Sequence, residues 1–190
     1  MGQIQMAVRM LEKKDAYTRG HSQRVSRYAV KTATVMGFSG NLLDQVRLGG
    51  ELHDIGKIGT RDAVLRKAGP LTPVEFEEIK KHVVEGEELL EPLRREHPLV
   101  LQIVRNHHER LDGTGFPDGL RGDAIPLAAR IVSVVDAFDA MTTERSYRTP
   151  LSPADAMDEL RRFAGVQFDQ EVVAAFLRSY PDPVKLPLLG

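Results

Sequence analysis

Apolar residues recur along most of this chain at intervals of three and four, which is the spacing of one face of an α-helix. A clear example begins at His21 and ends at Gly37. Similar patterns cover segments 1–17, 41–53, 73–90, 98–108, 127–141, 153–163 and 169–177. No segment convincingly alternates apolar and polar residues as a half-buried strand does. The pattern predicts an all-α fold, a helical bundle of roughly seven to nine helices.

Polar residues in front of several apolar runs predict where helices begin. Three of these residues are Asn41, Ser152 and Asp169. The side-chain oxygen of such a residue accepts a hydrogen bond from the first turn of the helix. Thr72 is the strongest signal, because Pro73 follows it and Glu75 is placed to complete a capping box. The helix that starts there is predicted to continue to residue 90 and to carry His82.

Length, composition and charge narrow the class of protein. The chain has 190 residues, 42% of them hydrophobic, a net charge of −1 and no cysteine. These values indicate one domain over residues 1–180 and an extended tail over 181–190. Near-neutral charge argues against binding a nucleic acid polymer, and no apolar run approaches the roughly 20 residues of a membrane span. We expect a cytoplasmic domain, with a regulatory domain upstream of a first segment that reads like the middle of a helix.

The stretch from Glu51 to Gly59 concentrates candidate chemistry. His53 and Asp54 place an imidazole and a bridging-capable carboxylate at one point. If the stretch is helical as far as Lys57, that cation lies one turn along the same face. A pair of metal ligands and a proton donor or phosphate contact would then share one pocket.

Further candidate ligands fall on the inner parts of predicted helices. They are His82, His107, His108 and Asp136. A lone helical histidine is more often a paired core residue than a ligand, and Asp136 alone can be a buried hydrogen-bond partner. Burying them all is costly unless every group is paired or bound to metal. Six ligands exceed the need of one tetrahedral zinc, so we predict two divalent metal ions bridged by Asp54. Iron or manganese is favoured, and zinc or nickel also accepts such ligands.

These residues, in this order, resemble the HD-GYP family, a branch of the HD-domain metal-dependent phosphohydrolases. The resemblance rests on His53-Asp54 with Lys57, His82, His107-His108-Glu109, the segment 112–117, Ile125-Pro126-Leu127 and the segment 136–141. It covers the chain from about Asp15 to Phe176. It implies a helical domain that hydrolyses the bacterial second messenger cyclic di-GMP at a centre of two or three metals.

The resemblance also implies roles for individual residues. The metal ligands would be His53, Asp54, His82, His107, His108 and Asp136. Lys57 would be the proton donor to the leaving oxygen or a phosphate contact. Arg145 and Arg148 match positions that hold substrate phosphate, and Asp139 matches a position near the guanine. The loop that gives the family part of its name corresponds to Gly115, Phe116 and Pro117.

Two of the departures from the family pattern bear on the substrate and on the number of metals. Phe116 stands where the family has tyrosine, so the aromatic face is kept and the hydroxyl is lost. Tyr17 stands where three-metal members have a glutamate, four residues before His21. We therefore expect two metals and the linear product pGpG. For His21 the alternatives are a residue that supports a metal ligand from behind, a residue on the substrate side, or a helix cap.

Two other functions remain open at this stage. The domain can be a sensor of cyclic di-GMP, or it can dock a diguanylate cyclase domain through the loop from Gly115 to Gly122, with little turnover. Alternatively, the hydrolysed substrate can be 3′,3′-cyclic GMP-AMP. The predicted ligands and Lys57 are all present, which favours an enzyme.

Overall fold

The computed structural model describes residues 10–11, 14, 20–144 and 149–180. These residues form α-helices, short 3-10 helices and loops, and among them there is no β-strand. The predicted all-α fold is confirmed. Most of the predicted helix over 1–17, and the whole predicted tail over 181–190, lie outside the described residues. No helix in the described part of the chain is both long and apolar enough to cross a bilayer.

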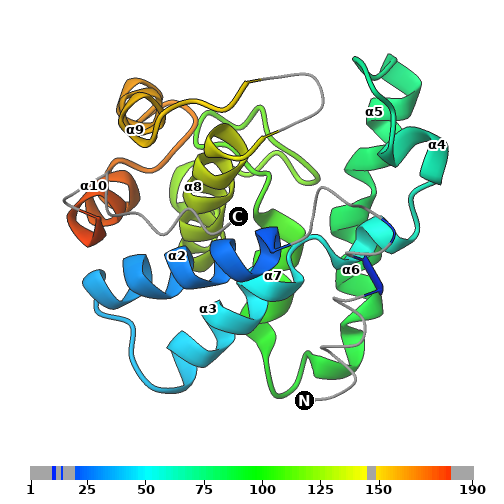
Figure 1. Cartoon of the computed structure of the whole chain (residues 1–190). Coiled ribbons are helices and arrows are strands. Elements are labelled where there is room, and N and C mark those ends of the chain that lie inside the picture. The colour runs from blue at the N-terminus through cyan, green and yellow to red at the C-terminus, as the bar shows by residue number, and fades with distance from the viewer. Residues whose placement is uncertain (1–9, 12–13, 15–19, 145–148, 181–190) are drawn as a thin grey trace.

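Helix α8 (Leu127–Thr142) runs through the larger hydrophobic core. Four helices pack against it: α2 (His21–Val35), α7 (Pro98–Asn106), α9 (Pro153–Arg162) and α10 (Gln170–Ser179). Figure 1 shows α2 below α8, with α9 and α10 on its left. The buried Phe138 ring of α8 meets Tyr28 at a centroid distance of 5.7 Å and Phe176 at 4.9 Å. Neighbours on several sides explain the nearly continuous apolar sequence of α8.

A smaller core joins α3 (Asn41–Leu52) to α7, and α6 (His82–Leu89) packs beside it. The 3-10 helix η2 (Ile55–Ile58) follows α3 and lies directly on α6. This close approach requires Gly56, because a Cβ atom there would overlap the backbone carbonyl of His82. The packing of η2 therefore brings the segment after α3 next to the start of α6.

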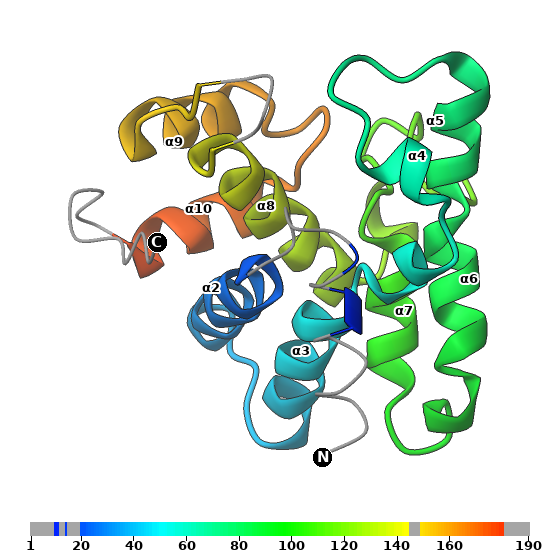
Figure 2. The same ribbon diagram turned by 45° about the vertical axis from the view of Figure 1, so that its right-hand side comes forward.

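Helices α4 (Asp62–Leu65) and α5 (Pro73–Lys80) stand on the side of the molecule away from α9 and α10, as both views show (Figures 1 and 2). Helix α5 contains no buried residue. The capping box predicted at its start is present, with both Thr72 and Glu75 bonded as expected.

The other predicted helix starts are confirmed with one exception. The side chains of Ser152 and Asp169 accept bonds from the first turns of α9 and α10. The prediction for Asn41 was wrong: Gly40 is the N-cap, and Asn41 is the first helical residue. The positive φ of Gly40 starts the helix one residue earlier without a side-chain cap.

The single helix predicted over 73–90 is divided at Lys81. The Lys81 N–H donates to Glu78, in the tighter 3-10 manner, and the next helix begins at His82. Similarly, α7 ends at Asn106, so His107 and His108 lie just after the helix. The loop predicted after them is confirmed as far as the 3-10 helix η4 (Gly122–Ala124).

Candidate metal centre

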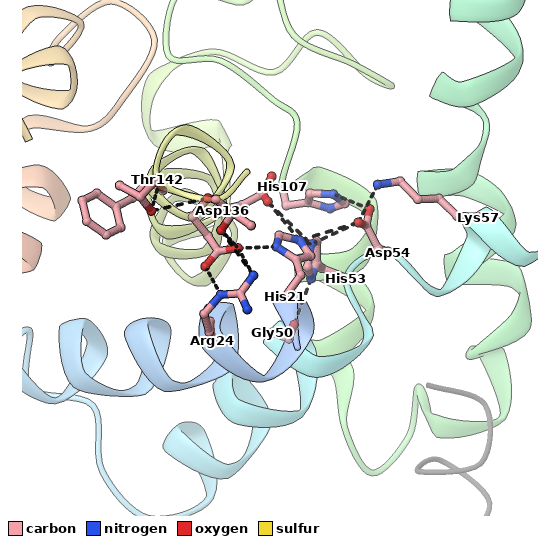
Figure 3. Close-up of polar contacts among 12 residues, drawn as sticks. His21, Arg24, Gly50, His53, Asp54, Lys57, His107, Asp136 and Thr142 are labelled. Carbon is pink, nitrogen blue, oxygen red and sulfur yellow. Dashed lines mark hydrogen bonds and ion pairs between the residues drawn. The ribbon is translucent and has the colours of Figure 1, made fainter. Parts of the chain in front are cut away.

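The six predicted metal ligands come from α6, from α8 and from the segments directly after α3 and α7, and they converge on one region. His53 is the C-cap of α3, His82 opens α6, and Asp136 lies within α8. Figure 3 shows His53, Asp54, His107 and Asp136 directed toward one another. The helix ends explain the convergence, because they point ligands from separate elements into the same space.

The ligand atoms form two groups, each lying within 4.8 Å. One group contains Asp54, His82, His107 and His108, and the other contains His21, His53 and Asp136. The Oδ2 atom of Asp54 lies 3.5 Å from Nε2 of His53 and 3.8 Å from Nε2 of His21. Asp54 therefore stands between the two groups.

Backbone carbonyls fix the orientation of three imidazoles. The Nδ1 atoms of His53, His82 and His107 lie 2.9, 2.7 and 3.0 Å from the carbonyls of Gly50, Ile79 and Val104. A carbonyl only accepts, so each Nδ1 carries the proton and each Nε2 keeps a lone pair. Outer hydrogen bonds of this kind typically orient metal-binding histidines.

Three of the buried side-chain atoms that lack a hydrogen-bond partner lie in the first group. They are Asp54 Oδ1, His82 Nε2 and His107 Nε2. The first two lie 3.3 Å apart. Two acceptors that face each other in a buried site repel unless a cation or a proton lies between them. The donor set therefore fits a divalent metal bound by imidazole and carboxylate.

The pKa values keep this donor set ready for a cation. Burial alone would raise the pKa of the Asp54 carboxyl, but the neighbouring Lys57 cation is the largest influence in the opposite direction, and that pKa lies well below its usual range. Burial and the neighbouring His108 lower the pKa of His107. Burial, with a further contribution from His82, lowers the pKa of His108 to about 3.

Lys57 reaches the centre without the continuous helix considered from sequence. Helix α3 ends at Leu52, and Lys57 lies on η2. The tighter turn still brings its Nζ atom to 2.5 Å from Oδ2 of Asp54. Figure 3 shows Lys57 approaching Asp54 from the side opposite His21. Lys57 therefore lies beside the pair of His53 and Asp54, as the sequence predicts.

His21 is a buried member of the cluster that sequence reasoning left open. Gly20 is the N-cap of α2, so His21 is not a helix cap. Its Nδ1 lies 2.7 Å from Asp139, and its Nε2 lies 3.3 Å from both His53 Nε2 and Asp136 Oδ1. Burial alone would lower the pKa of His21, but Asp139 and Asp136 raise it above its ordinary value.

The resemblance places Asp139 near the guanine. In the structure this carboxylate is buried, and both of its oxygens accept hydrogen bonds within the chain. Oδ1 accepts a bond from Arg24 at 2.6 Å, while Oδ2 accepts from Arg24 and His21. Asp139 therefore orients His21, and its position near the guanine stays a prediction.

The loop after His108 folds back over it. The Phe116 ring lies on the His108 ring, with centroids 4.9 Å apart and planes 32° apart. Gly115 permits this, because a Cβ atom there would meet the backbone of His108, Glu109 and Arg110 at 2.4–2.6 Å. Glu109 is buried and holds the far side of the loop by accepting bonds from the N–H groups of Asp118 and Leu120. Pro117 follows Phe116 in the same loop.

Three residues named from sequence lie outside the described residues. They are Arg145 and Arg148, expected to hold phosphate, and Tyr17, expected to replace a third metal's ligand. Sequence reasoning also left Arg24 unmentioned. The sequence did contain a signal for Arg24: it is a basic residue one helical turn after His21, on the same face of the predicted helix.

Comparison with known proteins gives consistent matches. The sequence model of the HD domain family matches residues 5–172. A cyclic di-GMP phosphodiesterase of Thermotoga maritima is 39% identical over 88% of this chain and 46% of its own length. A 3′3′-cGAMP-specific phosphodiesterase 2 of Vibrio cholerae is 34% identical over 90% of this chain and 33% of its own length.

A solved structure supports the fold. The Bdellovibrio bacteriovorus HDG"Y"P protein Bd1817 superposes with a TM-score of 0.69 at 23% identity, over 85% of this chain and 52% of that one. This chain thus spans less than half the length of the two curated relatives. The family model nevertheless covers most of it, including every predicted ligand. The chain belongs to the HD domain family, within which its motifs resemble the HD-GYP branch.

Proposed function

We propose that this domain is a metal-dependent phosphodiesterase that hydrolyses cyclic di-GMP to linear pGpG. The observation that carries the proposal is the set of unpaired acceptor atoms on Asp54, His82 and His107, buried within one group. The relative from Thermotoga maritima, named a cyclic di-GMP phosphodiesterase, supports the substrate.

Two divalent ions fit the two donor groups, one held by Asp54, His82, His107 and His108 and one by His53, Asp136 and His21, with Asp54 between them. Iron or manganese suits these mixed ligands, and zinc or nickel is the alternative. When bound, such a pair activates water and neutralises the charge of a phosphodiester. We assign two ions, and not three, because Tyr17 stands where a glutamate ligand is expected.

Lys57 protonates or electrostatically stabilises the leaving oxygen of the substrate. Its Nζ atom lies beside the Asp54 carboxylate and is partly exposed, so it can face both the centre and a ligand. Arg145 and Arg148 hold the substrate phosphates, as guanidinium groups commonly do. Phe116 and its neighbours Gly115 and Pro117 form a wall of the substrate site beside His108.

The test is turnover of cyclic di-GMP by protein loaded anaerobically with iron(II) or with manganese, with products separated by chromatography. We expect pGpG as the main early product. Asp54→Ala should abolish turnover and lower the bound metal, because both groups lose the carboxylate between them. The matched control is Asp44→Ala, which removes an exposed carboxylate from the same helix region.

Full activity in Asp54→Ala would contradict the metal-centre proposal. GMP as the main early product would contradict the two-metal assignment. No turnover by protein that holds metal and binds cyclic di-GMP would favour a sensor, or a module that docks a diguanylate cyclase or an upstream domain.

A second substrate is favoured by one comparison. The relative named a 3′3′-cGAMP-specific phosphodiesterase matches 90% of this chain. Parallel assays with cyclic di-GMP and 3′,3′-cyclic GMP-AMP, compared by kcat/KM, decide between the two. The substrate with the higher kcat/KM is the one to assign.

A further inference from the structure

Helix α5 is held in place by polar links and not by a core. None of its residues is buried. Its start is fixed by the capping box of Thr72 and Glu75, and Lys67 pairs with Glu75 at 2.6 Å. Glu78 pairs with Arg61 at 2.5 Å. These contacts fix the position of α5 although none of its residues is buried. This arrangement indicates a role for the exposed side chains of α5.

One face of α5 is turned toward the loop over the metal centre. The Phe76 ring meets the Phe116 ring edge-on, with centroids 6.4 Å apart and planes 81° apart. Lys80 lies one turn further on, and its Nζ atom is 5.5 Å from the Phe76 centroid and 5.7 Å from that of Phe116. A cation near aromatic faces at these distances is attracted to both rings.

The more open aromatic surface beside the centre is therefore that of Phe76. Phe116 is covered on one side by His108 and makes a T-shaped contact with Phe76. Phe76 remains 48% exposed. A single half-exposed phenylalanine is common on protein surfaces. Phe76, however, contacts Phe116, which in turn lies on the ring of the predicted metal ligand His108.

We propose that Phe76 is a substrate-binding residue that stacks on a purine base of the substrate, with Lys80 holding the Phe76–Phe116 pair in place. This inference rests on the proposed function, because it assumes a cyclic dinucleotide whose phosphate lies at the centre. Every base offers a π face, and aromatic side chains are the usual platforms for unpaired bases.

Val74 provides the matched comparison within the same helix. It lies two positions earlier, roughly 200° around the helix axis from Phe76. Its side chain is 75% exposed and, being aliphatic, offers no ring for stacking. A general effect of removing apolar surface from α5 should appear in both Val74→Ala and Phe76→Ala, whereas loss of a stacking surface should appear only in the second.

The experiment compares wild type, Phe76→Ala, Phe76→Leu, Phe76→Tyr and Val74→Ala. We would measure kcat and KM for cyclic di-GMP with manganese-loaded protein, the metal content, and binding of cyclic di-GMP to chelator-treated protein by calorimetry. Phe76→Ala should raise KM and weaken binding by roughly 10-fold, in the range for losing one base–aromatic stack. Its kcat and metal content should match wild type.

The remaining variants separate stacking from simple apolar contact. Phe76→Tyr should behave as wild type, and Phe76→Leu should resemble Phe76→Ala, since leucine has no π face. Equal effects of Phe76→Ala and Val74→Ala would overturn the proposal, as would wild-type protein that fails to bind cyclic di-GMP. If wild type binds without turnover, the proposed function fails, yet a binding loss confined to Phe76→Ala and Phe76→Leu still supports the stacking role.

Discussion

The Nδ1 atom of His21 lies 2.7 Å from Oδ2 of Asp139, so a residue at the start of α2 is oriented by one 118 positions later on α8. Arg24 holds the same carboxylate through two bonds. With its Nδ1–H donated to Asp139, His21 directs Nε2 toward His53 and Asp136. Asp139 is thus a positioning residue for the second donor group.

Asp139→Asn should weaken metal binding at that group selectively. The neutral amide accepts a weaker bond from His21 and no longer neutralises the buried Arg24. We expect the affinity for one of the two ions to fall by about 10–100-fold, as for other outer hydrogen-bond partners. Metal titration and metal content after dialysis would measure this. Asp158→Asn, which changes an exposed carboxylate on α9, is the control, and two unchanged affinities in Asp139→Asn would contradict the role.

Acid should destabilise the metal-free protein through its buried histidines. The pKa values of His53, His107 and His108 are lowered in the folded state, that of His108 to about 3. Below their ordinary value of 6.5 the unfolded chain binds protons that the folded chain does not, so stability is lost as the pH falls. His21 acts in the opposite direction, because its raised pKa favours the folded state at low pH.

His108→Gln isolates one of these contributions. Between about pH 6 and about pH 4, the number of protons taken up on unfolding should fall by close to one relative to wild type. The slope of unfolding free energy against pH, from denaturant titrations with chelator present, reports that number. His97→Gln removes a histidine outside the cluster, and an identical slope in both variants would refute the assignment.

Most of the candidate ligands could be predicted from sequence because local sequence patterns contain them. His53 and Asp54 are adjacent, His107 and His108 are adjacent, and His82 follows a capped helix start. The same reasoning predicted that Lys57 lies beside the ligand pair, and this is correct although the helix that it assumed ends at Leu52. The 3-10 turn that follows directs the Lys57 side chain to nearly the same side as an α-helical turn would.

What could not be predicted depends on contacts across the fold. The roles of His21 and Asp139 follow from the packing of α2 on α8, which no local signal encodes. The break at Lys81 was missed because residues 75–85 contain neither glycine nor proline. The exposed position of α5 was missed because its capping signal predicts a start and not a packing partner.

Glu109→Gln should loosen the loop that covers His108. The buried carboxylate accepts N–H bonds from Asp118 at 2.7 Å and Leu120 at 3.0 Å. Glutamine has one accepting oxygen, so its NH₂ group would face one of these donors. We expect a loss of about 1–3 kcal/mol, the usual cost of a buried polar group left unsatisfied. Faster amide exchange at both positions, absent in the exposed control Glu96→Gln, would demonstrate it, and protection equal to wild type would argue against the role.

Thr72→Ala and Ser152→Ala should have contrasting effects although each removes one helix cap. Such a cap contributes about 1 kcal/mol to its helix. Helix α9 buries Ala156, Met157 and Leu160, so loss of the Ser152 cap should lower the melting temperature of the whole domain.

Helix α5 buries nothing, so loss of the Thr72 cap should remain local. It should appear as faster amide exchange over residues 75–80 with an unchanged melting temperature. Under the proposed role of Phe76 it should also raise KM for cyclic di-GMP, because the ring would be less well positioned. A drop in melting temperature equal to that of Ser152→Ala would mean that α5 unfolds only with the domain, and that its polar links form part of the cooperative structure.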